Sequence, residues 1–239
     1  MPESNNNSFV TSHHSDLNCL SAKQYQPAIN SHQLVVSDSA PANPQQRKAL
    51  RNQLRRARRA LTYQQQRLAG QRLLKILLRR QEFLKAKHIA VYLANDGEIN
   101  PRQIIEAAWS MGKTCYLPVL HPIYHNRLWF LRYQPTTKLA PNRFNILEPT
   151  VSNGQVKSAW AMDLVLLPLV GFDQQGGRLG MGGGFYDRTF EFILKSPRKP
   201  RPKLVGLAHE CQRVNKLPIA SWDIPLAGIA SDAKYYDVI

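Results

Sequence analysis

One glycine-rich segment, residues 171–188, combines the residue types that can hold a phosphate group. Because glycine has no side chain, the backbone N–H groups of such a loop can come close to phosphate oxygens. The glycines suited to this cradle are Gly180, Gly182, Gly183 and Gly184. Arg178 can add a bidentate, charge-assisted contact, and Asp187 can carry a Mg²⁺ that bridges phosphates. The spacing therefore indicates a nucleotide or another phosphate ligand.

The same residues also fit a glycine-rich turn in which Asp187 only compensates a helix dipole. The segment does not match the Walker pattern, since it contains no Gly-Lys-Ser or Gly-Lys-Thr, and it is not a dinucleotide fingerprint. The glycines alone therefore leave a nucleotide site and a structural turn both open. Arg178 and Asp187, at fixed distances from the glycines, favour the site.

The neighbouring segments indicate how the glycines are positioned. Residues 163–172 form the most apolar run of the chain, which predicts a buried central strand. Residues 185–194 follow the glycines and predict a helix. In open α/β sheets, ligands bind beyond the carboxyl ends of the strands. The order of the chain places the glycine-rich segment at such an end.

Short apolar runs alternate with helical patterns over the rest of the chain. A helix is predicted at residues 101–112, and strands are predicted at 88–94, 114–120, 128–133, 203–208 and, as the last strand, 227–231. This order of strands and helices predicts an α/β protein whose mostly parallel sheet is covered on both faces.

The composition changes at about residue 45. Residues 1–44 are polar, rich in Ser, Asn and Gln, and aperiodic, which predicts a disordered leader followed by one domain over residues 45–239. From Gln45 onward, leucines recur at helical spacing between Arg and Lys residues. This pattern predicts one or two long amphipathic helices with a break near Thr62, a suitable N-cap.

The positive charge is concentrated in the same segment. The chain has a net charge of +16, and Glu82 is the only acidic residue between Arg47 and Lys87. Such a balance indicates an anionic partner and keeps a nucleic-acid-binding protein open as an alternative, although the segment lacks interleaved aromatic residues. A different phosphate-ligand enzyme on a similar fold is a second alternative.

The remaining composition indicates the compartment. No stretch approaches the roughly eighteen uninterrupted apolar residues of a membrane helix. The three cysteines, Cys19, Cys115 and Cys211, form no Cys-x-x-Cys pair, and an odd number suits a reducing compartment. We therefore expect a soluble, cytoplasmic protein without a membrane partner.

Taken together, these motifs resemble those of the 5-formyltetrahydrofolate cyclo-ligase family. The run Leu-Leu-Pro-Leu-Val-Gly-Phe-Asp, followed by Gly-Gly-Arg-Leu-Gly-Met-Gly-Gly-Gly-Phe-Tyr-Asp-Arg, looks like the signature of that family. Shorter matches keep the family's order, with Arg-Lys-Ala-Leu-Arg at 47–51, Val-Tyr-Leu at 91–93, Asp-Gly-Glu-Ile at 96–99, Leu-Pro-Val at 117–119 and Trp-Asp-Ile-Pro at 222–225. The resemblance covers about residues 45–236.

The resemblance implies a Rossmann-like three-layer α/β/α fold and a ligase that uses ATP with Mg²⁺. The implied reaction converts 5-formyltetrahydrofolate, with or without a polyglutamate chain, into 5,10-methenyltetrahydrofolate and releases ADP and phosphate. It also implies that a small molecule rather than a nucleic acid or a membrane is the partner, and it favours a monomer.

The resemblance also carries the family's site residues over, position by position. The implied ATP-binding residues are Arg47, Lys48, Arg51, Arg178, Leu179, Gly180, Met181, Gly182, Gly183, Gly184, Phe185 and Tyr186. The implied folate-binding residues are Leu93, Glu98, Met181, Gly182, Gly183, Gly184 and Phe185. Arg178 and Asp187 are implied as catalytic residues, and Asp187 and Asp223 as ligands of Mg²⁺.

Four positions depart from the pattern of some relatives. Many relatives have Lys at the position of Arg47, and some carry an acid at that of Ala227. Some relatives carry basic side chains where Met181 and Gly183 stand here, so phosphate binding would rest more on backbone amides, Arg178 and Arg188. Without the resemblance, Glu98 would be interpreted as a charge that caps the following helix, and Asp223 as a turn residue.

Overall fold

The computed structural model describes residues 43–150, 156–195, 202–217 and 223–238. All of them lie in the second of the two units into which the chain divides, residues 35–239. The division into a leader and a domain at residue 45 stays a prediction, since residues 1–42 lie outside the described ranges.

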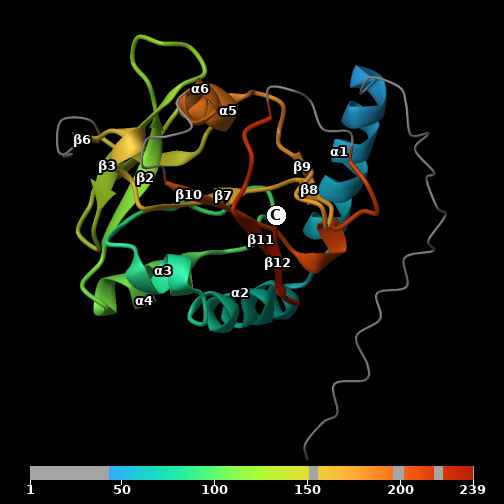
Figure 1. Ribbon diagram of the computed structural model, residues 1–239, viewed down its shortest axis with the longest axis horizontal. Helices are drawn as coiled ribbons and strands as arrows, with labels where there is room; N and C mark the ends of the chain where they lie inside the picture. The colour runs from blue at the N-terminus through green and yellow to red at the C-terminus, as the bar shows by residue number, and fades with distance from the viewer. Residues whose placement is uncertain (1–42, 151–155, 196–201, 218–222, 239) are drawn as a thin grey trace, which may run out of the picture. The chain divides into compact units, whose positions relative to one another are not determined.

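The described strands of this unit include one eight-stranded sheet (Figure 1). In spatial order, its strands are β12 (Tyr235–Asp237), β11 (Gly228–Ala230), β10 (Lys203–Leu207), β7 (Leu164–Pro168), β1 (His88–Ala90), β2 (Thr114–Leu120), β3 (Leu128–Tyr133) and β6 (Val156–Lys157). The strands from β11 to β2 run parallel, whereas β12, β3 and β6 pair antiparallel at the edges. The prediction of a mostly parallel sheet is confirmed.

The direction of the connections changes between β1 and β7, which lie side by side in the middle of the sheet. From β1 the chain passes to β2 on one side, and from β7 it passes to β10 on the other. At such a switch point a crevice opens beyond the carboxyl ends of the two strands, and ligands bind there in doubly wound folds. The topology therefore selects the carboxyl ends of β1 and β7 as the position of a site.

Helices cover both faces of the sheet (Figure 1). One face carries α2 (Tyr63–Leu77), α3 (Gln81–Lys85) and α4 (Arg102–Ser110), and the other carries α5 (Phe185–Phe190) and α6 (Phe192–Lys195). Strand β7 contributes to both cores, because its side chains alternate between faces. Leu164 and Leu166 pack in the cluster of α2 and α4, and Val165 and Leu167 in that of α5 and α6. The fold is a three-layer α/β/α structure, as expected.

The basic segment forms two helices that break where the sequence predicts. Helix α1 (Pro44–Arg59) begins after Asn43, whose side chain accepts a hydrogen bond of 2.9 Å from the Gln45 N–H. Helix α2 begins after Thr62, whose hydroxyl accepts from the Gln65 N–H while the Gln65 side chain accepts from the Thr62 N–H. This reciprocal capping box satisfies two N–H groups of the helix end and stops α1 from continuing into α2.

The strand predicted at residues 163–172 is divided in the structure. Strand β7 ends at Pro168, which has no N–H with which to continue the sheet. A two-stranded hairpin of β8 (Gly171–Phe172) and β9 (Arg178–Leu179) follows and leads into the glycines. The helix predicted at 185–194 is likewise interrupted, at Glu191, between α5 and α6. The glycine-rich segment is therefore held between a short hairpin and a short helix.

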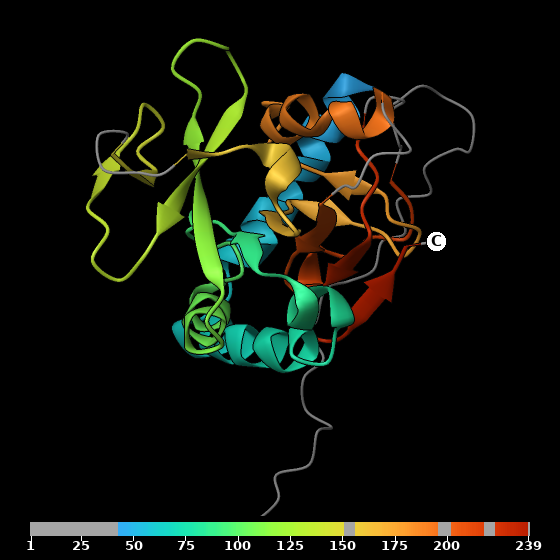
Figure 2. The same cartoon turned by 60° about the vertical axis from the view of Figure 1, so that its left-hand side comes forward.

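Other short strands have no predicted counterpart. Strands β4 (Leu139–Pro141) and β5 (Leu147–Pro149) form a hairpin. This hairpin contacts β2 and β3, which form the long light-green ribbon of Figure 2. The strand predicted to be last, 227–231, corresponds to β11, and the prediction that it ends the sheet is wrong, because β12 follows and pairs with it antiparallel.

Candidate active site

A large cleft lies where the topology places a site, at the carboxyl ends of β1 and β7. Its volume is about 1730 Å³, whereas pockets for one drug-sized ligand commonly measure about 300–1,000 Å³. Its walls include helix α1, the loop after β1, the ends of β2 and β7, the β4–β5 hairpin and the segment from Arg178 to Lys195. The cleft is therefore large enough for two substrates side by side.

The glycines form one wall of this cleft. Gly182 and Gly184 have left-handed backbones with φ of 98° and 66°, which favour glycine over other residues. The Arg51 Nε donates a 2.8 Å hydrogen bond to the Gly180 carbonyl, and the Arg188 Nη1 donates one of 2.7 Å to the Gly183 carbonyl. These contacts bring two cations against the loop.

The loop also retains hydrogen-bond donors. Among the described residues, none accepts a hydrogen bond from the N–H groups of Gly182, Gly183 or Gly184. Helix α5 has six residues, so its dipole is a small contribution. Backbone amides together with neighbouring arginines are the features that can bind an anion here.

Two carboxylates lie beside the loop. Asp187 forms an ion pair with Arg178, whose side chain is 9% exposed, and it also accepts a 3.3 Å hydrogen bond from the Ile224 N–H. Asp223, next to Ile224 in the chain, lies 4.0 Å from Arg47 of α1. The sequence positions 178, 187 and 223 therefore meet at one end of the cleft.

A buried carboxylate also lines the cleft. The side chain of Glu98 is 12% exposed, and one of its oxygens accepts a 3.1 Å hydrogen bond from the Asn95 N–H. Burial raises the pKa of Glu98 to about 7, against the opposing charge of Arg58. Burial and the charge of Glu98 also raise the pKa of Tyr186, the residue beside Asp187. Glu98 is thus a proton-sensitive acceptor in the wall of the cleft.

Most of the residues implied by the sequence meet in this cleft. Those that line it are Arg47, Arg51, Leu93, Glu98, Arg178, Gly180, Met181, Gly182, Gly183, Gly184, Phe185, Tyr186, Asp187 and Asp223. The described lining does not include Lys48 or Leu179. Lys48 is exposed on α1, and Leu179 is buried against Leu54 and Val170.

Other residues that line the cleft were not predicted from the sequence. Phe144, at the tip of the β4–β5 hairpin, is half exposed, and its ring contacts Phe185 edge to face with 5.9 Å between centroids. An aromatic residue in a polar turn, between Asn142 and Asn145, was the available signal. Arg55 also lines the cleft and continues the four-residue spacing of Arg47 and Arg51, which places all three on one helix face.

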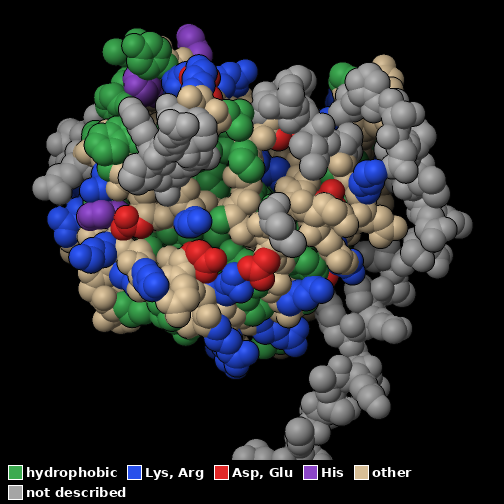
Figure 3. All heavy atoms as spheres, viewed as in Figure 1, with side chains coloured by type: hydrophobic (Ala, Val, Ile, Leu, Met, Phe, Trp, Pro, Cys, Tyr) green, Lys and Arg blue, Asp and Glu red, His purple; other side chains and the backbone are tan. Residues whose placement is uncertain are grey.

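The cations of the two basic helices have different surroundings. Arg47, Arg51 and Arg55 of α1 line the cleft. Helix α2 instead directs Arg67, Arg72, Lys75 and its neighbour Arg79 toward solvent. Figure 3 shows Lys and Arg side chains gathered on the lower side of the molecule, where Figure 1 places α2 and α3. Much of the basic segment is therefore a solvated helix face.

Two searches of the described residues gave negative results. That part of the chain contains no group of three or more His, Cys, Asp or Glu side chains arranged to hold a metal ion by themselves. No helix within it is both long and apolar enough to cross a membrane.

The chain matches known proteins over most of its length. The model of the 5-formyltetrahydrofolate cyclo-ligase family matches residues 43–232. The 5-formyltetrahydrofolate cyclo-ligase of Escherichia coli strain K12 is 42% identical over 184 residues, covering 77% of this chain and 99% of the relative. The protein of the same name from Haemophilus influenzae is 43% identical over 187 residues, covering 78% and 98%.

Two solved structures are also similar. The NMR structure of Aquifex aeolicus 5,10-methenyltetrahydrofolate synthetase superposes with a TM-score of 0.67 at 27% identity, covering 80% of this chain and 92% of the other. The structure of a 5,10-methenyltetrahydrofolate synthetase from Mycoplasma pneumoniae has a TM-score of 0.60 at 23% identity, covering 78% and 98%. The latter supports the fold alone.

Proposed function

The chain belongs to the 5-formyltetrahydrofolate cyclo-ligase family, and from this premise we propose how its cleft performs the reaction of that family. The enzyme cyclises 5-formyltetrahydrofolate to 5,10-methenyltetrahydrofolate with ATP and releases ADP and phosphate. One observation carries the assignment of the site. The same cleft is lined by the glycine loop with its cations and by the buried carboxylate of Glu98.

The triphosphate of ATP binds at the glycine end. The N–H groups of Gly182, Gly183 and Gly184 donate to phosphate oxygens, because no described residue accepts from them. Arg51 and Arg188 lie against the same loop through the carbonyls of Gly180 and Gly183, so their remaining guanidinium N–H groups add positive charge. Arg178 stabilises the charge of the transferred phosphate.

The folate binds at the Glu98 end. An ionised carboxylate accepts two hydrogen bonds, and the amino group and ring N–H of a pterin present two adjacent donors. Leu93 lines the cleft on the same wall, and Phe144 and Phe185 add aromatic surface near its mouth. These apolar groups remove ring surface from water, and the carboxylate fixes the orientation of the pterin.

The chemistry follows from bringing the formyl group to the γ-phosphate. The formyl oxygen attacks the γ-phosphorus, the bond to the bridging oxygen breaks, and ADP leaves with the electron pair. N10 then attacks the formyl carbon, the carbon–oxygen bond breaks, phosphate leaves, and N10 loses its proton. Phosphorylation turns a poor leaving group, an amide oxygen, into a good one. The protein's part is to align the reactants and to balance charge away from water.

Asp187 and Asp223 are the residues that would hold a Mg²⁺. Two carboxylates without a third protein ligand suit Mg²⁺, which commonly keeps waters and binds substrate phosphates as well. Such an ion neutralises phosphate charge. Without it, the two carboxylates face Arg178 and Arg47. These ion pairs keep the carboxylates beside the phosphate loop.

We also propose the compartment, the oligomeric state and the form of the folate substrate. We place the enzyme in the cytoplasm, because Cys115 and Cys211 are free thiols and Cys115 is buried. We expect a monomer, and we expect that a folate with a polyglutamate chain is accepted, since Lys195 lines the cleft and carries positive charge.

The test is the formation of methenyltetrahydrofolate, followed by its absorbance with and without ATP and Mg²⁺. We expect turnover only with all components present. In the same assay, Arg178→Ala is expected to raise the KM for ATP, and unchanged ATP kinetics would remove Arg178 from the site. A thermal-shift series provides the comparison of ligand classes: ATP with 5-formyltetrahydrofolate stabilises the protein, whereas duplex DNA and sugar phosphates do not.

A further inference from the structure

Arg58 is a fully buried arginine that the reaction itself does not explain. Its side chain has no exposed surface, and it lies at the end of α1, between that helix and the sheet. Burying a charged group is costly unless the group is paired and hydrogen-bonded. The contacts that compensate this cost therefore indicate the role of the Arg58 side chain.

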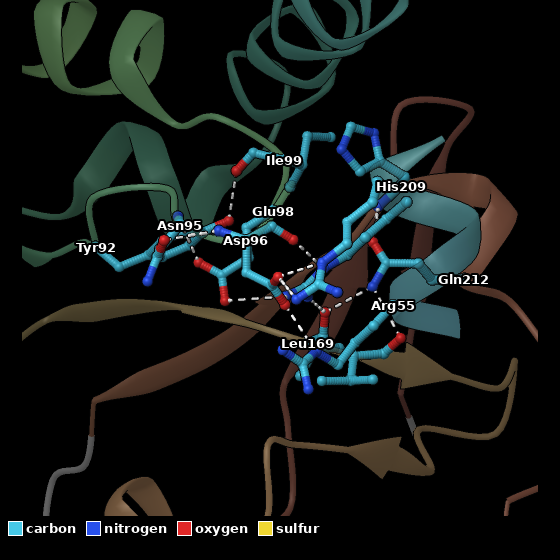
Figure 4. Close-up of polar contacts among 12 residues, drawn as sticks. Arg55, Tyr92, Asn95, Asp96, Glu98, Ile99, Leu169, His209 and Gln212 are labelled. Atoms are coloured by element: carbon cyan, nitrogen blue, oxygen red, sulfur yellow. Dashed lines mark hydrogen bonds and ion pairs between the residues drawn. The ribbon is translucent and has the colours of Figure 1, made fainter. Parts of the chain in front are cut away.

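Arg58 contacts two strand ends. The Nε donates to the Asp96 carbonyl at 2.9 Å, and the Nη2 contacts the Asp96 carboxylate, also at 2.9 Å. The Nη1 donates to the Leu169 carbonyl, after β7, at 3.3 Å. Gln212, in the 3₁₀ helix η3 (Glu210–Gln212) after β10, donates to the same carbonyl at 2.7 Å (Figure 4). The arginine thus ties the loop after β1 to the neighbouring strand ends.

The loop that Arg58 holds has an unfavourable backbone. Asp96 has a φ of 54°, and Gly97 has a φ of 74°. Two consecutive left-handed residues, one of them not glycine, persist only when surrounding contacts hold them. Gly97 also lies against the backbone of Arg58 and Arg59, where an added Cβ would come within 3.3 Å. The shape of the loop therefore depends on contacts with the end of α1.

This loop leads directly to Glu98. The Glu98 N–H donates to the Asn95 carbonyl at 3.0 Å, and the Asn95 N–H donates back to the Glu98 carboxylate at 3.1 Å. Figure 4 shows Asn95, Asp96 and Glu98 on one loop, with their polar atoms connected by dashed lines. The Arg58 Nη2 lies 3.7 Å from the other Glu98 oxygen. Holding Asp96 therefore fixes where the carboxylate of Glu98 points.

The charged groups around Glu98 come from several elements. Arg58 and Arg55 face it from α1, and Asp96 from its own loop. Tyr92 and Tyr186, whose pKa values are raised by burial and by the charge of Glu98, face it from the end of β1 and from α5. Of these groups, Arg58 is the cation that contacts both Glu98 and the backbone of the loop.

Asp96 is tightly held by the same helix. Burial alone would raise the pKa of its carboxyl, but hydrogen bonds from Arg55, Arg59 and Arg58 lower it to about 2. His209, which follows β10, has its pKa lowered by burial and faces Arg58. Asp96 therefore stays ionised near neutral pH, and Arg58 keeps a charged partner there.

We propose that Arg58 is a positioning residue for folate binding, which holds the Asn95–Glu98 loop so that the Glu98 carboxylate faces the cleft. It acts through Glu98 and contacts no reacting atom. Helix α1 itself has another anchor, since Leu54 and Leu50 pack against Val170 and Leu179. The loss of Arg58 therefore affects the folate end of the cleft rather than Arg51 at the ATP end. The inference rests on the proposed function in assigning Glu98 to folate.

The kinetic test compares Arg58→Met with Arg56→Met, an exposed arginine on the same helix. Arg58→Met is expected to raise the KM for 5-formyltetrahydrofolate about tenfold, the equivalent of about 1.4 kcal/mol, and to leave the KM for ATP unchanged. The acid limb of folate binding should move to higher pH, because Glu98 loses a neighbouring cation. Arg56→Met should leave all of these quantities unchanged.

A double-mutant cycle with Glu98→Gln tests whether Arg58 acts through Glu98. In the Glu98→Gln background, Arg58→Met should add little to the folate KM. Additive effects, or equal increases in the KM for folate and for ATP, would show a general structural role and overturn the proposal. Should Arg58→Met fail to fold, Arg58→Lys replaces it. A lysine keeps the charge but cannot make the same fork of hydrogen bonds, so the folate KM rises while the acid limb stays in place.

Amide hydrogen exchange tests the loop without catalysis. In the ligand-free protein, the amides of Asn95 and Glu98 should exchange faster in Arg58→Met than in Arg56→Met. Equal exchange in the two variants would overturn the proposal even if the enzyme cyclises folate. Absent turnover in the unmodified protein would overturn the proposed function, and the exchange rates would still decide the role of Arg58 in holding the loop.

Discussion

Ionisation of the Glu98 carboxyl near neutral pH lowers the free energy of unfolding. Burial raises the pKa of its carboxyl to about 7, although Arg58 lies 3.7 Å away. Folding raises the pKa of this carboxyl, so its contribution to stability is complete when the pH lies below the ordinary pKa of 4.5. That contribution is lost as the pH rises through about 7, where the carboxyl ionises in the folded protein. The ionised form is therefore useful for binding rather than for stability.

Folate binding should follow the protonation of this carboxyl. Only the carboxylate accepts both N–H donors of a pterin, so the KM for 5-formyltetrahydrofolate is expected to rise as the pH falls below about 7. Glu98→Gln should raise that KM roughly 10- to 100-fold, the value of a charge-assisted hydrogen bond, and should abolish the pH dependence. Steady-state kinetics between pH 6 and 8.5 measure both effects. A Gln variant that keeps the acid limb would assign the titration to another group.

Asp187 has two roles that a substitution can separate. Its carboxylate pairs with the nearly buried Arg178, and we propose that it also holds Mg²⁺. Asp187→Asn preserves the shape but removes the charge, so kcat should fall roughly 10²-fold, a loss typical for a group that balances transition-state charge. The Mg²⁺ concentration for half-maximal rate should increase. Circular dichroism should show a folded protein, and full activity at low Mg²⁺ would rule out the metal role.

Among the helices and strands, those whose residues show a clear hydrophobic pattern or a capping residue were predicted from the sequence. The strands at 114–120 and 128–133 have the predicted bounds, and the break at Thr62 follows from a cap formed with Gln65. Strand β12 and the hairpins β4–β5 and β8–β9 are two or three residues per strand. Their pairing is decided by tertiary contacts, which a periodicity of a few residues cannot reveal.

The site likewise has one part that could be predicted from the sequence and one part that could not. Its glycine segment is contiguous and could be recognised in the sequence, whereas the Glu98 end depends on residues that are distant in the chain. Arg58 stands four residues after Leu54, so helical spacing places the two on one face, but an arginine at such a position is normally solvated. Of Arg56, Arg58 and Arg59, Arg58 alone is buried. The distinction arises because one helix face meets the loop after β1, and that contact is a property of the folded chain.

Two Gly→Ala variants can distinguish an effect on stability from an effect on ATP binding. Gly182→Ala must place an alanine at a φ of 98°, and its Cβ would lie 3.5 Å from the Arg51 guanidinium carbon. We expect the backbone to shift and the KM for ATP to rise, with a loss of stability of about 1–2 kcal/mol. Gly112→Ala is the matched control, since Gly112 has a φ of 71° with open space around it, outside the cleft lining. It should lose similar stability but keep the ATP kinetics.

At the scale of the whole molecule, the switch point explains why distant residues meet. The loops after β1 and β7 leave the same edge of the sheet, so Glu98 and Gly180 face one cleft although they stand 82 positions apart in the sequence. Helix α1 closes this cleft from the side, with Arg47 and Arg51 along it and Arg58 beneath the Glu98 loop. We therefore expect that the part of the chain needed for catalysis begins with α1.

A chain that begins at Asn43 should consequently retain the activity of the full chain. Asn43 caps α1, the family match begins at the same residue, and the described lining of the cleft begins at Pro44. Because the cap contributes about 1 kcal/mol, removal of Asn43 as well should lower the melting temperature and raise the KM for ATP as the end carrying Arg47 frays. Kinetics and thermal melts of chains starting at residues 43 and 45 provide the comparison. Loss of turnover in the chain from Asn43, with an unchanged melting temperature, would show that residues 1–42 contribute to the site.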